Sequence, residues 1–328
     1  MMTPRMTVVM PIYNVEAFVG EAIQSVLDQS FKDFELICVD DGGTDGSMEI
    51  VRNFCDPRIR IVCQENRGLA GARNTGIAHA RGDYIALLDS DDVWHRDKLV
   101  LHFVHLGANA DIGVSYAGSR MIDRDGMVLG VSMRPKLGRV SAEHIFCRNP
   151  IGNGSAPVLR RSVLELAKFS HPRDAERNCW FDEEFRQSED IEMWLRLAVK
   201  HQVVFAGIEG LLTDYRIIPG ALSANVVKQY LSWTKMLRKL KGYAPEFVLE
   251  HGDTARAYQL RYLARRSIQL GNFELARDLL KKAIGLEPRI IIEEPRKTAV
   301  TGGAVVAGSI LGAERFTALM RPFLKSAA

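Results

Sequence analysis

The segment GDYIALLDSDDVW (residues 82–94) places three carboxylates, Asp89, Asp91 and Asp92, directly after a short apolar run. The run is typical of a buried strand, and carboxylates gathered at a strand end repel one another unless a cation lies among them. At the carboxyl edge of an open α/β sheet, a divalent metal held by one or two carboxylates and a substrate's phosphates fits this need. A solvated acidic turn, in which Asp92 caps the next helix, is the alternative. This segment alone does not decide between the two.

Two further segments carry groups that could act with these carboxylates. SEDIEMWLRLA (residues 188–198) offers Glu189 and Asp190 at a helix start, and a single carboxylate can accept a proton from a hydroxyl. The alternative is structural, because Ser188 as N-cap with acids in the first turn is favourable at any helix start. Arg73, in the small-residue segment 65–78, could reach a nucleotide or balance the aspartates, unless it is a surface arginine on a tight helix–sheet contact. Arg196 is expected to order the acidic helix end, with a diphosphate contact as the alternative.

Strand-like and helix-like patterns alternate along the first part of the chain. The apolar runs cover residues 7–10, 34–39, 59–63 and 84–88, and the helical patterns cover about residues 17–27, 46–54 and 69–79. Such alternation predicts a mostly parallel sheet with helices on both faces. The loops at 11–14, 40–45 and 89–92 would then emerge at one edge. Because neither a GxGxxG nor a P-loop pattern is present, a metal rather than a glycine cradle would hold phosphates.

Composition excludes several classes of protein. The chain has 328 residues, 47% hydrophobic and 25% charged, which suits one large domain plus a smaller one. The net charge of +3 comes without a concentrated basic stripe, so no nucleic-acid partner is expected. Five cysteines without CxxC spacing indicate neither a disulfide framework nor a zinc site and fit a reducing cytosol. The first apolar run is too short for a signal peptide, so we expect a cytoplasmic protein.

Five segments together resemble the family 2 glycosyltransferases, which are inverting enzymes with a GT-A fold. They are VVMPIYN (8–14), CVDDGGTDGS (38–47), ENRGLAGARNTGI (65–77), GDYIALLDSDD (82–92) and SEDIEMWLRLA (188–198). The resemblance covers about residues 5–220 and implies a Rossmann-like α/β domain. It departs from the family pattern at Gly43, where serine is common, which leaves a side-chain contact at that position in question.

The resemblance implies roles for matching positions. Residues that would bind the donor nucleotide are Pro11, Tyr13, Asp40, Asp41, Arg73 and Asp89. Asp91 would be the direct ligand of Mg²⁺ or Mn²⁺, while Asp89 would face the ribose or bind the metal through water. Asp92 would be a second layer around the metal or only a helix cap. Asp190 would be the general base, with Glu189 as its neighbour.

The implied function is transfer of a sugar, with inversion, from a nucleoside-diphosphate sugar to a glycan or lipid-linked acceptor in polysaccharide assembly. A UDP-sugar is the favoured donor. One alternative is a sugar-nucleotide pyrophosphorylase, although the chain lacks the glycine- and arginine-rich N-terminal loop of that class. The other is a non-catalytic helical-repeat interaction protein with a degenerate sheet domain. The complete carboxylate set favours the enzyme.

The region expected to choose the acceptor carries no residue assignment. Its sequence predicts a strand at 111–117, a hairpin at 121–133 around Asp125-Gly126, a helix at 141–148 and a glycine-rich loop at 149–158. Tyr215 and Arg216 with Ser223 resemble the family's closing segment, and a plain connector is the alternative.

The C-terminal part reads as helices. We expect a catalytic domain over residues 1–223 and a helical region over 224–328, in which residues 257–288 resemble one tetratricopeptide-like hairpin. Residues 298–313 carry no charge but are short and glycine-rich for a membrane span. Their basic flanks suggest peripheral contact with an anionic membrane surface. Packing of the hairpin on the catalytic domain, binding of a partner and self-association remain open.

Overall fold

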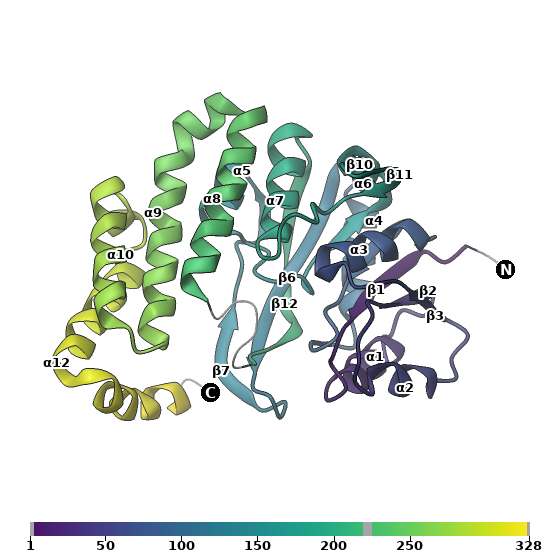
Figure 1. Ribbon diagram of the computed structural model, residues 1–328, viewed down its shortest axis with the longest axis horizontal. Helices are drawn as coiled ribbons and strands as arrows, with labels where there is room; N and C mark the ends of the chain where they lie inside the picture. The colour runs from purple at the N-terminus through teal and green to yellow at the C-terminus, as the bar shows by residue number, and fades with distance from the viewer. Residues whose placement is uncertain (1–2, 219–224, 327–328) are drawn as a thin grey trace. The chain divides into compact units, whose positions relative to one another are not determined.

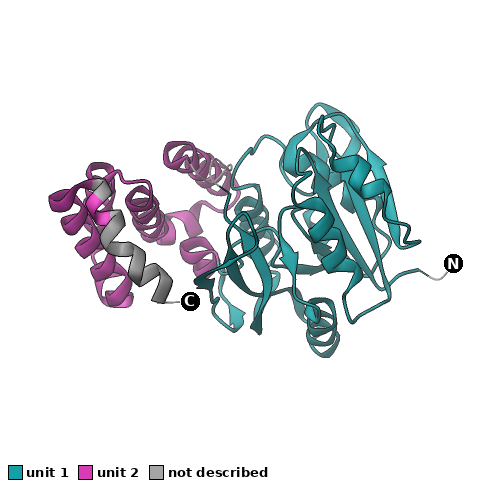
Figure 2. Cartoon of the chain, turned by 90° about the horizontal axis from the view of Figure 1, so that it is seen from below, with its two compact units in different colours: residues 1–142, 150–218 teal, residues 143–149, 219–328 magenta. Residues whose placement is uncertain are grey.

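The computed structural model describes residues 3–218 and 225–326, and the chain forms two compact units (Figures 1 and 2). The first comprises residues 1–142 and 150–218, and the second comprises residues 143–149 and 219–328. The predicted boundary near residue 223 lies outside the described residues. The short helix α5 (Ala142–Arg148) belongs almost wholly to the second unit.

The first half of the central sheet is parallel. Its strands lie in the order β3 (Ile59–Cys63), β2 (Phe34–Asp40), β1 (Met6–Ile12) and β4 (Tyr84–Leu87). All seven residues of β1 are buried, as expected for a strand covered on both faces. These four strands are the ones that the apolar runs predict. Their carboxyl ends meet at one edge of the sheet, which confirms the expected convergence of the three loops.

The second half of the sheet adds antiparallel strands. β9 (Val158–Arg160) runs antiparallel to both β4 and β6 (Ile112–Ile122), and β12 (Val204–Arg216) runs parallel to β6. The shorter strands β5 (Val93–Trp94), β7 (Val128–Met133) and β8 (Gly138–Val140) pair antiparallel with β12 or β6. Residues 123–127 connect β6 to β7, which confirms the hairpin around Asp125-Gly126. The α/β architecture is therefore confirmed, with a mixed sheet.

Helices cover both faces of the sheet. Met6, Val8 and Met10 of β1 pack in one core with α1 (Val19–Leu27), α2 (Ser47–Arg52) and α4 (Lys98–Ala108). On the opposite face, α3 (Gly68–His79) lies across β1 and β2 (Figure 1). Its Gly76 contacts Val9 so closely that an added Cβ would overlap the valine side chain. Side chains of a strand alternate between faces, so this arrangement uses both faces of β1.

The remaining elements of the first unit carry the acidic segment. They are α6 (Arg161–Ala167), the hairpin of β10 (Phe169–His171) and β11 (Asp174–Cys179), and α7 (Glu189–Leu195), which continues into the π-helical turn η1 (Arg196–Lys200). Phe181 and Phe205 each make an edge-on contact with the ring of Trp194. This packing fixes α7 by its apolar side.

The second unit is helical. Besides α5 it contains α8 (Val226–Tyr243), α9 (Pro245–Gln269), α10 (Phe273–Leu286), α11 (Ile290–Glu293) and α12 (Pro295–Ser326). The predicted hairpin over 257–288 is formed by α9 and α10, although α9 begins earlier, at Pro245. α12 runs through the glycine-rich segment that the sequence suggested would weaken a helix, and its backbone leaves helical geometry only at Gly312. Across residues 3–218 and 225–326, no helix has the length and apolar character that crossing a membrane requires.

Candidate active site

Hydrogen bonds from backbone amides to side-chain oxygens hold the loops after β1 and β2 in place. Asn14 adopts a positive φ of 52°, and its Oδ1 accepts a hydrogen bond of 2.8 Å from the amide of Thr44. Asp40 at the end of β2 accepts a bond of 3.1 Å from the amide of Gly42, which also has a positive φ. Pro11 is buried in β1 beside Val39 of β2. These loops thus form one continuous rim at the sheet edge.

Asp41 faces the start of α3. Its carboxylate is 2% exposed and accepts bonds from Gln64 Nε2 at 2.6 Å and from the amides of Arg67 and Gly68 at 2.9 and 3.0 Å. Amides at the first turn of a helix stabilise a carboxylate placed there. Tyr13, by contrast, is about half exposed at 49% and free to stack on a ligand. The nucleotide-binding roles of Pro11, Tyr13, Asp40 and Asp41 remain predictions.

Asp92 is a buried structural residue. It is fully buried, and it accepts hydrogen bonds from Ser155 Oγ at 2.6 Å and from the amide of Arg216 at 2.9 Å. Burial and the charges of Asp91 and Asp89 raise its pKa. The expectation that Asp92 caps the next helix is wrong, because β5 follows it directly and α4 has Asp97 at its N-cap. Asp92 instead ties the aspartate turn to β12 and to the loop before β9.

Asp91 lies half-buried beside Asp92 in the same turn. Among the described residues, no lysine, arginine or histidine forms an ion pair with its side chain. Burial and repulsion by Asp89 raise the pKa of Asp91 to about 6. Arg216 lies behind this turn, where its Nε donates to the carbonyl of Asp91 at 2.8 Å. A half-buried carboxylate beside other carboxylates is stabilised by a cation, so the donor set fits a divalent metal.

Arg73 joins the two acidic segments. Its side chain is 1% exposed, with Nη2 at 2.7 Å from Asp89 Oδ1 and Nη1 at 2.9 Å from Glu189 Oε1. Burial opposes its charge, but attraction to Asp89 and Glu189 prevails and raises the pKa of Arg73. Arg73 thus balances an aspartate of the turn, and the surface position is wrong, while its nucleotide-binding role remains a prediction. The guanidinium thereby places Asp89 and Glu189 on either side of one buried charge.

The catalytic candidate Asp190 follows Glu189 at the start of α7. Burial raises the pKa of both carboxyls, to about 7 for Glu189, although Arg73 opposes the rise in each. Asp190 remains partly exposed, and its Oδ1 accepts a bond of 2.7 Å from the amide of Ile191. Ser188 occupies the N-cap position with a positive φ of 61°, yet its side chain makes no capping bond. A backbone strained in this way suits a functional site better than an ordinary helix start.

Arg196 orders the helix end, as expected. Its guanidinium is buried and bonds to Glu192 at 3.0 Å and to the carbonyls of Ala167 and Trp180, both at 2.5 Å. These bonds direct the guanidinium into the protein interior, so the diphosphate alternative loses its support.

The sequence did not reveal the structural role of the loop before β9. Ser155 Oγ accepts a bond of 2.9 Å from the amide of Asp89 and donates to Asp92, while its carbonyl accepts a bond of 2.9 Å from Trp94 Nε1. At Gly154, an added Cβ would overlap Nη2 of Arg73 and lie 2.8 Å from Oδ2 of Asp89. The only signal in the sequence is the pair of small residues within NPIGNGSAPV. This loop supports the aspartate turn from behind.

The side chains that the structure describes form no metal cage by themselves at this site. Within the described ranges, no group of three or more histidine, cysteine, aspartate or glutamate side chains is placed to hold a metal ion. Mg²⁺ and Mn²⁺ sites in phosphoryl-handling proteins often rely on one or two carboxylates, with the substrate's phosphates supplying further ligands. Asp89 and Asp91 match that pattern.

Comparison with known proteins agrees with this architecture. Residues 7–166 match the family described as Glycosyl transferase family 2. The UDP-Glc:alpha-D-GlcNAc-diphosphoundecaprenol beta-1,3-glucosyltransferase WfgD of Escherichia coli is 30% identical over 224 residues, which are 68% of this chain and 81% of the relative. The enzyme of the same description named WfaP, also from Escherichia coli, is 27% identical over 242 residues, 71% of this chain and 86% of the relative.

Solved structures show the same fold. The mannosyltransferase PcManGT from Pyrobaculum calidifontis, in complex with GDP-Man and Mn²⁺, aligns with a TM-score of 0.60 at 20% identity over 99% of this chain and 86% of that one. Residues 1–349 of TarS from S. aureus, in complex with UDP, align with a TM-score of 0.53 at 16% identity over 88% and 92%. The sheet and its helices are thus GT-A-like. The chain belongs to glycosyl transferase family 2 and is a glycosyltransferase.

Proposed function

We propose that this enzyme transfers a sugar with inversion from a nucleoside-diphosphate sugar, with a UDP-sugar favoured, to a glycan or lipid-linked acceptor. The observation that carries the proposal is the buried Arg73, which holds Asp89 of the aspartate turn and Glu189 of α7 on one guanidinium. Asp89 on the proposed donor side and Glu189 beside the proposed base are thereby held in fixed positions relative to each other. Relatives named as UDP-glucose transferases with a diphosphoundecaprenol-linked acceptor support the donor and acceptor classes.

In this proposal Asp91 binds Mg²⁺ or Mn²⁺ directly, and Asp89 faces the ribose or reaches the metal through water. The metal would neutralise the negative charge that develops on the leaving diphosphate. Arg73 fixes Asp89, while Ser155 and Arg216 hold the backbone of the turn that presents Asp91. A structural relative crystallised with Mn²⁺ and GDP-Man supports the choice of metal.

Asp190 is proposed as the general base. An inverting transfer needs a carboxylate on the side of the sugar opposite the leaving group, where it accepts the proton of the attacking hydroxyl. Burial raises the pKa of Asp190, which makes this carboxylate a stronger base than an exposed aspartate. Glu189, the residue before Asp190, is paired with Arg73. In this proposal it keeps that partner throughout the reaction.

The rim formed by the first two loops is proposed to bind the nucleotide. Exposed Tyr13 would stack on the base beside Pro11, with Asp40 and Asp41 toward the ribose. Residues 1–223 would form the catalytic domain and residues 224–328 a helical region. We place the enzyme in the cytoplasm, at the inner face of the cell membrane, in the assembly of a polysaccharide.

One preparation tests the proposal. With Mn²⁺ present, a panel of UDP-, GDP- and dTDP-sugars should include a donor whose binding, measured by calorimetry, is lost in Asp91→Ala and on chelation. Asp83→Ala is the matched control, because Asp83 is an exposed carboxylate at the opposite end of β4. Donor binding that survives both chelation and Asp91→Ala would reject the metal role.

The proposed role of Asp190 as general base is tested with the same donor sugar. Asp190→Asn should keep donor and metal affinity while transfer, or slow donor hydrolysis, falls by about 10²–10⁴-fold, the usual contribution of a general base. Loss of donor binding in Asp190→Asn would instead place this residue in the donor site.

A further inference from the structure

The first segment of α12, residues 295–311, has one face that packs within the second unit. Val305 lies in a buried cluster with Ala264 of α9 and with Ala276 and Leu280 of α10. Gly308 meets the ring of Phe273 so closely that an added Cβ would overlap it. This face is therefore fixed on the hairpin of α9 and α10.

The opposite face is apolar and exposed. Val300, Val306 and Ile310 are 72%, 59% and 77% exposed. At 100° per residue they fall, together with Gly303, within an arc of roughly 120°. No charged residue occurs between 298 and 313. We call this surface the α12 face, meaning Val300, Gly303, Val306 and Ile310.

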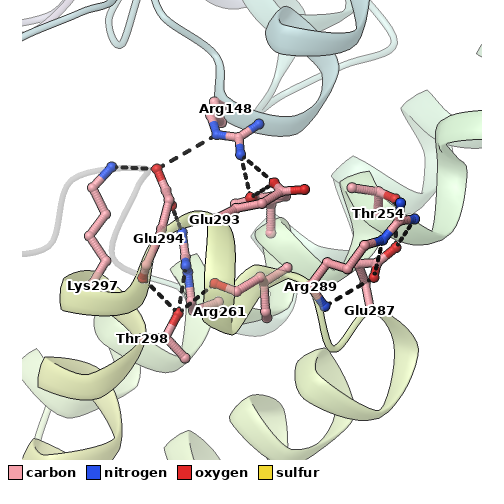
Figure 3. Close-up of polar contacts among 11 residues, drawn as sticks. Arg148, Thr254, Arg261, Glu287, Arg289, Glu293, Glu294, Lys297 and Thr298 are labelled. Carbon is pink, nitrogen blue, oxygen red and sulfur yellow. Dashed lines mark hydrogen bonds and ion pairs between the residues drawn. The ribbon is translucent and has the colours of Figure 1, made fainter.

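The α12 face ends in positive charge. Arg296 lies one turn before Val300 in the same arc, is exposed, and forms no ion pair with any described residue. Neighbouring acids are already engaged, since Glu294 bonds to Arg261 and Lys297 (Figure 3). The apolar surface is thus bounded by a guanidinium that no acid in the described part of the chain balances.

The polar cluster beside the α12 face also fixes its orientation. Arg148 of α5 contacts Glu293 at 2.9 Å and Glu294 at 3.6 Å, and Arg261 of α9 donates to Thr298 Oγ1 at 2.9 Å (Figure 3). Ile292, which lies within this stretch, is 80% exposed. The bonds hold the start of α12 rigidly while the apolar side chains stay outside.

Size and charge favour one occupant of this face. A stable protein–protein interface buries roughly 800 Å² per partner, more than a surface one helix wide with a central glycine supplies. An anionic lipid surface, by contrast, accepts a narrow apolar face together with an adjacent cation. The segment is too short to span the bilayer, which leaves a position in the plane of the interface.

We propose that the α12 face, with Ile292 and Arg296, docks this enzyme on an anionic lipid surface. Val300, Val306 and Ile310 enter the boundary between headgroups and acyl chains, and Arg296 pairs with lipid phosphates. This binding goes beyond sugar transfer and does not depend on the donor site.

Flotation of the full chain with vesicles tests the proposal. The wild type should float with vesicles of equal parts phosphatidylcholine and phosphatidylglycerol and remain unbound with phosphatidylcholine alone. The double variant Val306→Asp, Ile310→Asp should lose at least about tenfold in partitioning, because two charges would enter the apolar layer. Arg296→Gln should reduce binding to the anionic vesicles by a smaller factor.

Leu249→Asp is the matched control, because Leu249 is 88% exposed on α9 and away from the α12 face in sequence. It should float like the wild type, and all variants should keep the wild-type circular dichroism and donor binding. Equal flotation of the double variant and the wild type would overturn the proposal, as would a wild type that never floats. A wild type that is a dimer by light scattering, with a monomeric double variant, would assign the face to a second copy instead.

Discussion

At the scale of single residues, Arg73 offsets the free-energy cost of burying carboxylates at the acidic site. Its two partners come from positions 16 and 116 residues away in the chain. A buried carboxylate without a cation is costly, whereas one guanidinium with a bond to each of two carboxylates offsets much of that cost. The same residue therefore serves both stability and the placement of the proposed catalytic groups.

Replacement of this residue should be severe. Arg73→Gln leaves the buried Glu189 and the half-buried Asp89 without their shared cation and is expected to lower the free energy of unfolding by about 3–5 kcal/mol in the absence of metal. Urea denaturation measures the change. Arg58→Gln, which breaks a more exposed pair with Asp56, should cost below about 1 kcal/mol. Similar losses in the two variants would show that the Arg73 pairs are no stronger than surface ones.

Asp91 gives the site a dependence on pH. Its pKa is about 6 instead of 3.8, so in the metal-free protein its ionisation opposes folding and its contribution to stability falls as pH rises from about 4 to 6. A metal binds only the ionised form, so Mn²⁺ affinity should fall by up to about tenfold per pH unit below pH 6. Titration of Mn²⁺ by electron paramagnetic resonance, with the donor present, measures this slope. A flat affinity between pH 5 and pH 7 would remove Asp91 as the ligand.

At the scale of elements, the sequence predicts the repeating strand and helix units well, because their apolar periodicity is local. It does not predict β9, a strand of three residues whose pairing depends on β4 and β6 far away in the chain. Of its two alternatives for Asp92, the helix cap is wrong, since an aspartate before a helical pattern looks like a cap whether or not a short strand intervenes. The helix through the glycines of α12 needs the packing of Gly308 on Phe273, which no local pattern reveals.

The contacts of Ser155 could not be predicted from the local sequence either. Its loop has the composition of a flexible connection, and only the fold brings it behind Asp89. The contact of Arg73 with the aspartate turn could be foreseen as one of several alternatives, because carboxylates gathered at a strand end call for a nearby cation. Its second partner, Glu189, could not, since that contact joins α3 to a segment more than a hundred residues later.

A buried lysine of α4, Lys98, should make the folding stability depend on pH. Lys98 Nζ donates to the carbonyl of Ala156 at 2.8 Å, beside His102 and the ring of Trp94. Burial lowers the pKa of Lys98 to about 7, against attraction by Asp92. Between pH 7 and 10.5 the unfolded chain holds a proton that the folded one lacks, so stability from this group rises with pH.

Lys98→Met should remove that rise. Thermal or urea unfolding between pH 7 and pH 9 should show the wild type gaining stability relative to Lys98→Met. Parallel pH profiles for the two proteins would mean that Lys98 keeps its proton in the folded state. Lys32→Met, at an exposed lysine, is the control and should leave the profile unchanged.

At the scale of the whole molecule, the two compact units have separate hydrophobic clusters. A ligand that binds one unit stabilises that unit by mass action. Differential scanning calorimetry should therefore resolve two transitions, of which only one moves upward with a donor sugar and Mn²⁺. Arg261→Met, which breaks a buried pair in the second unit, should lower only the other transition. A single transition that responds to both changes would show that the units unfold together.

The single guanidinium between Asp89 and Glu189 also constrains how this sequence can evolve. A neutral residue at position 73 leaves the buried Glu189 and the half-buried Asp89 without a cation, and a neutral residue at either partner leaves Arg73 half compensated. Substitutions at the three positions are therefore expected to appear together among related proteins rather than one at a time. A relative in which all three have become neutral would keep the fold and give up the link between its proposed donor and acceptor sides.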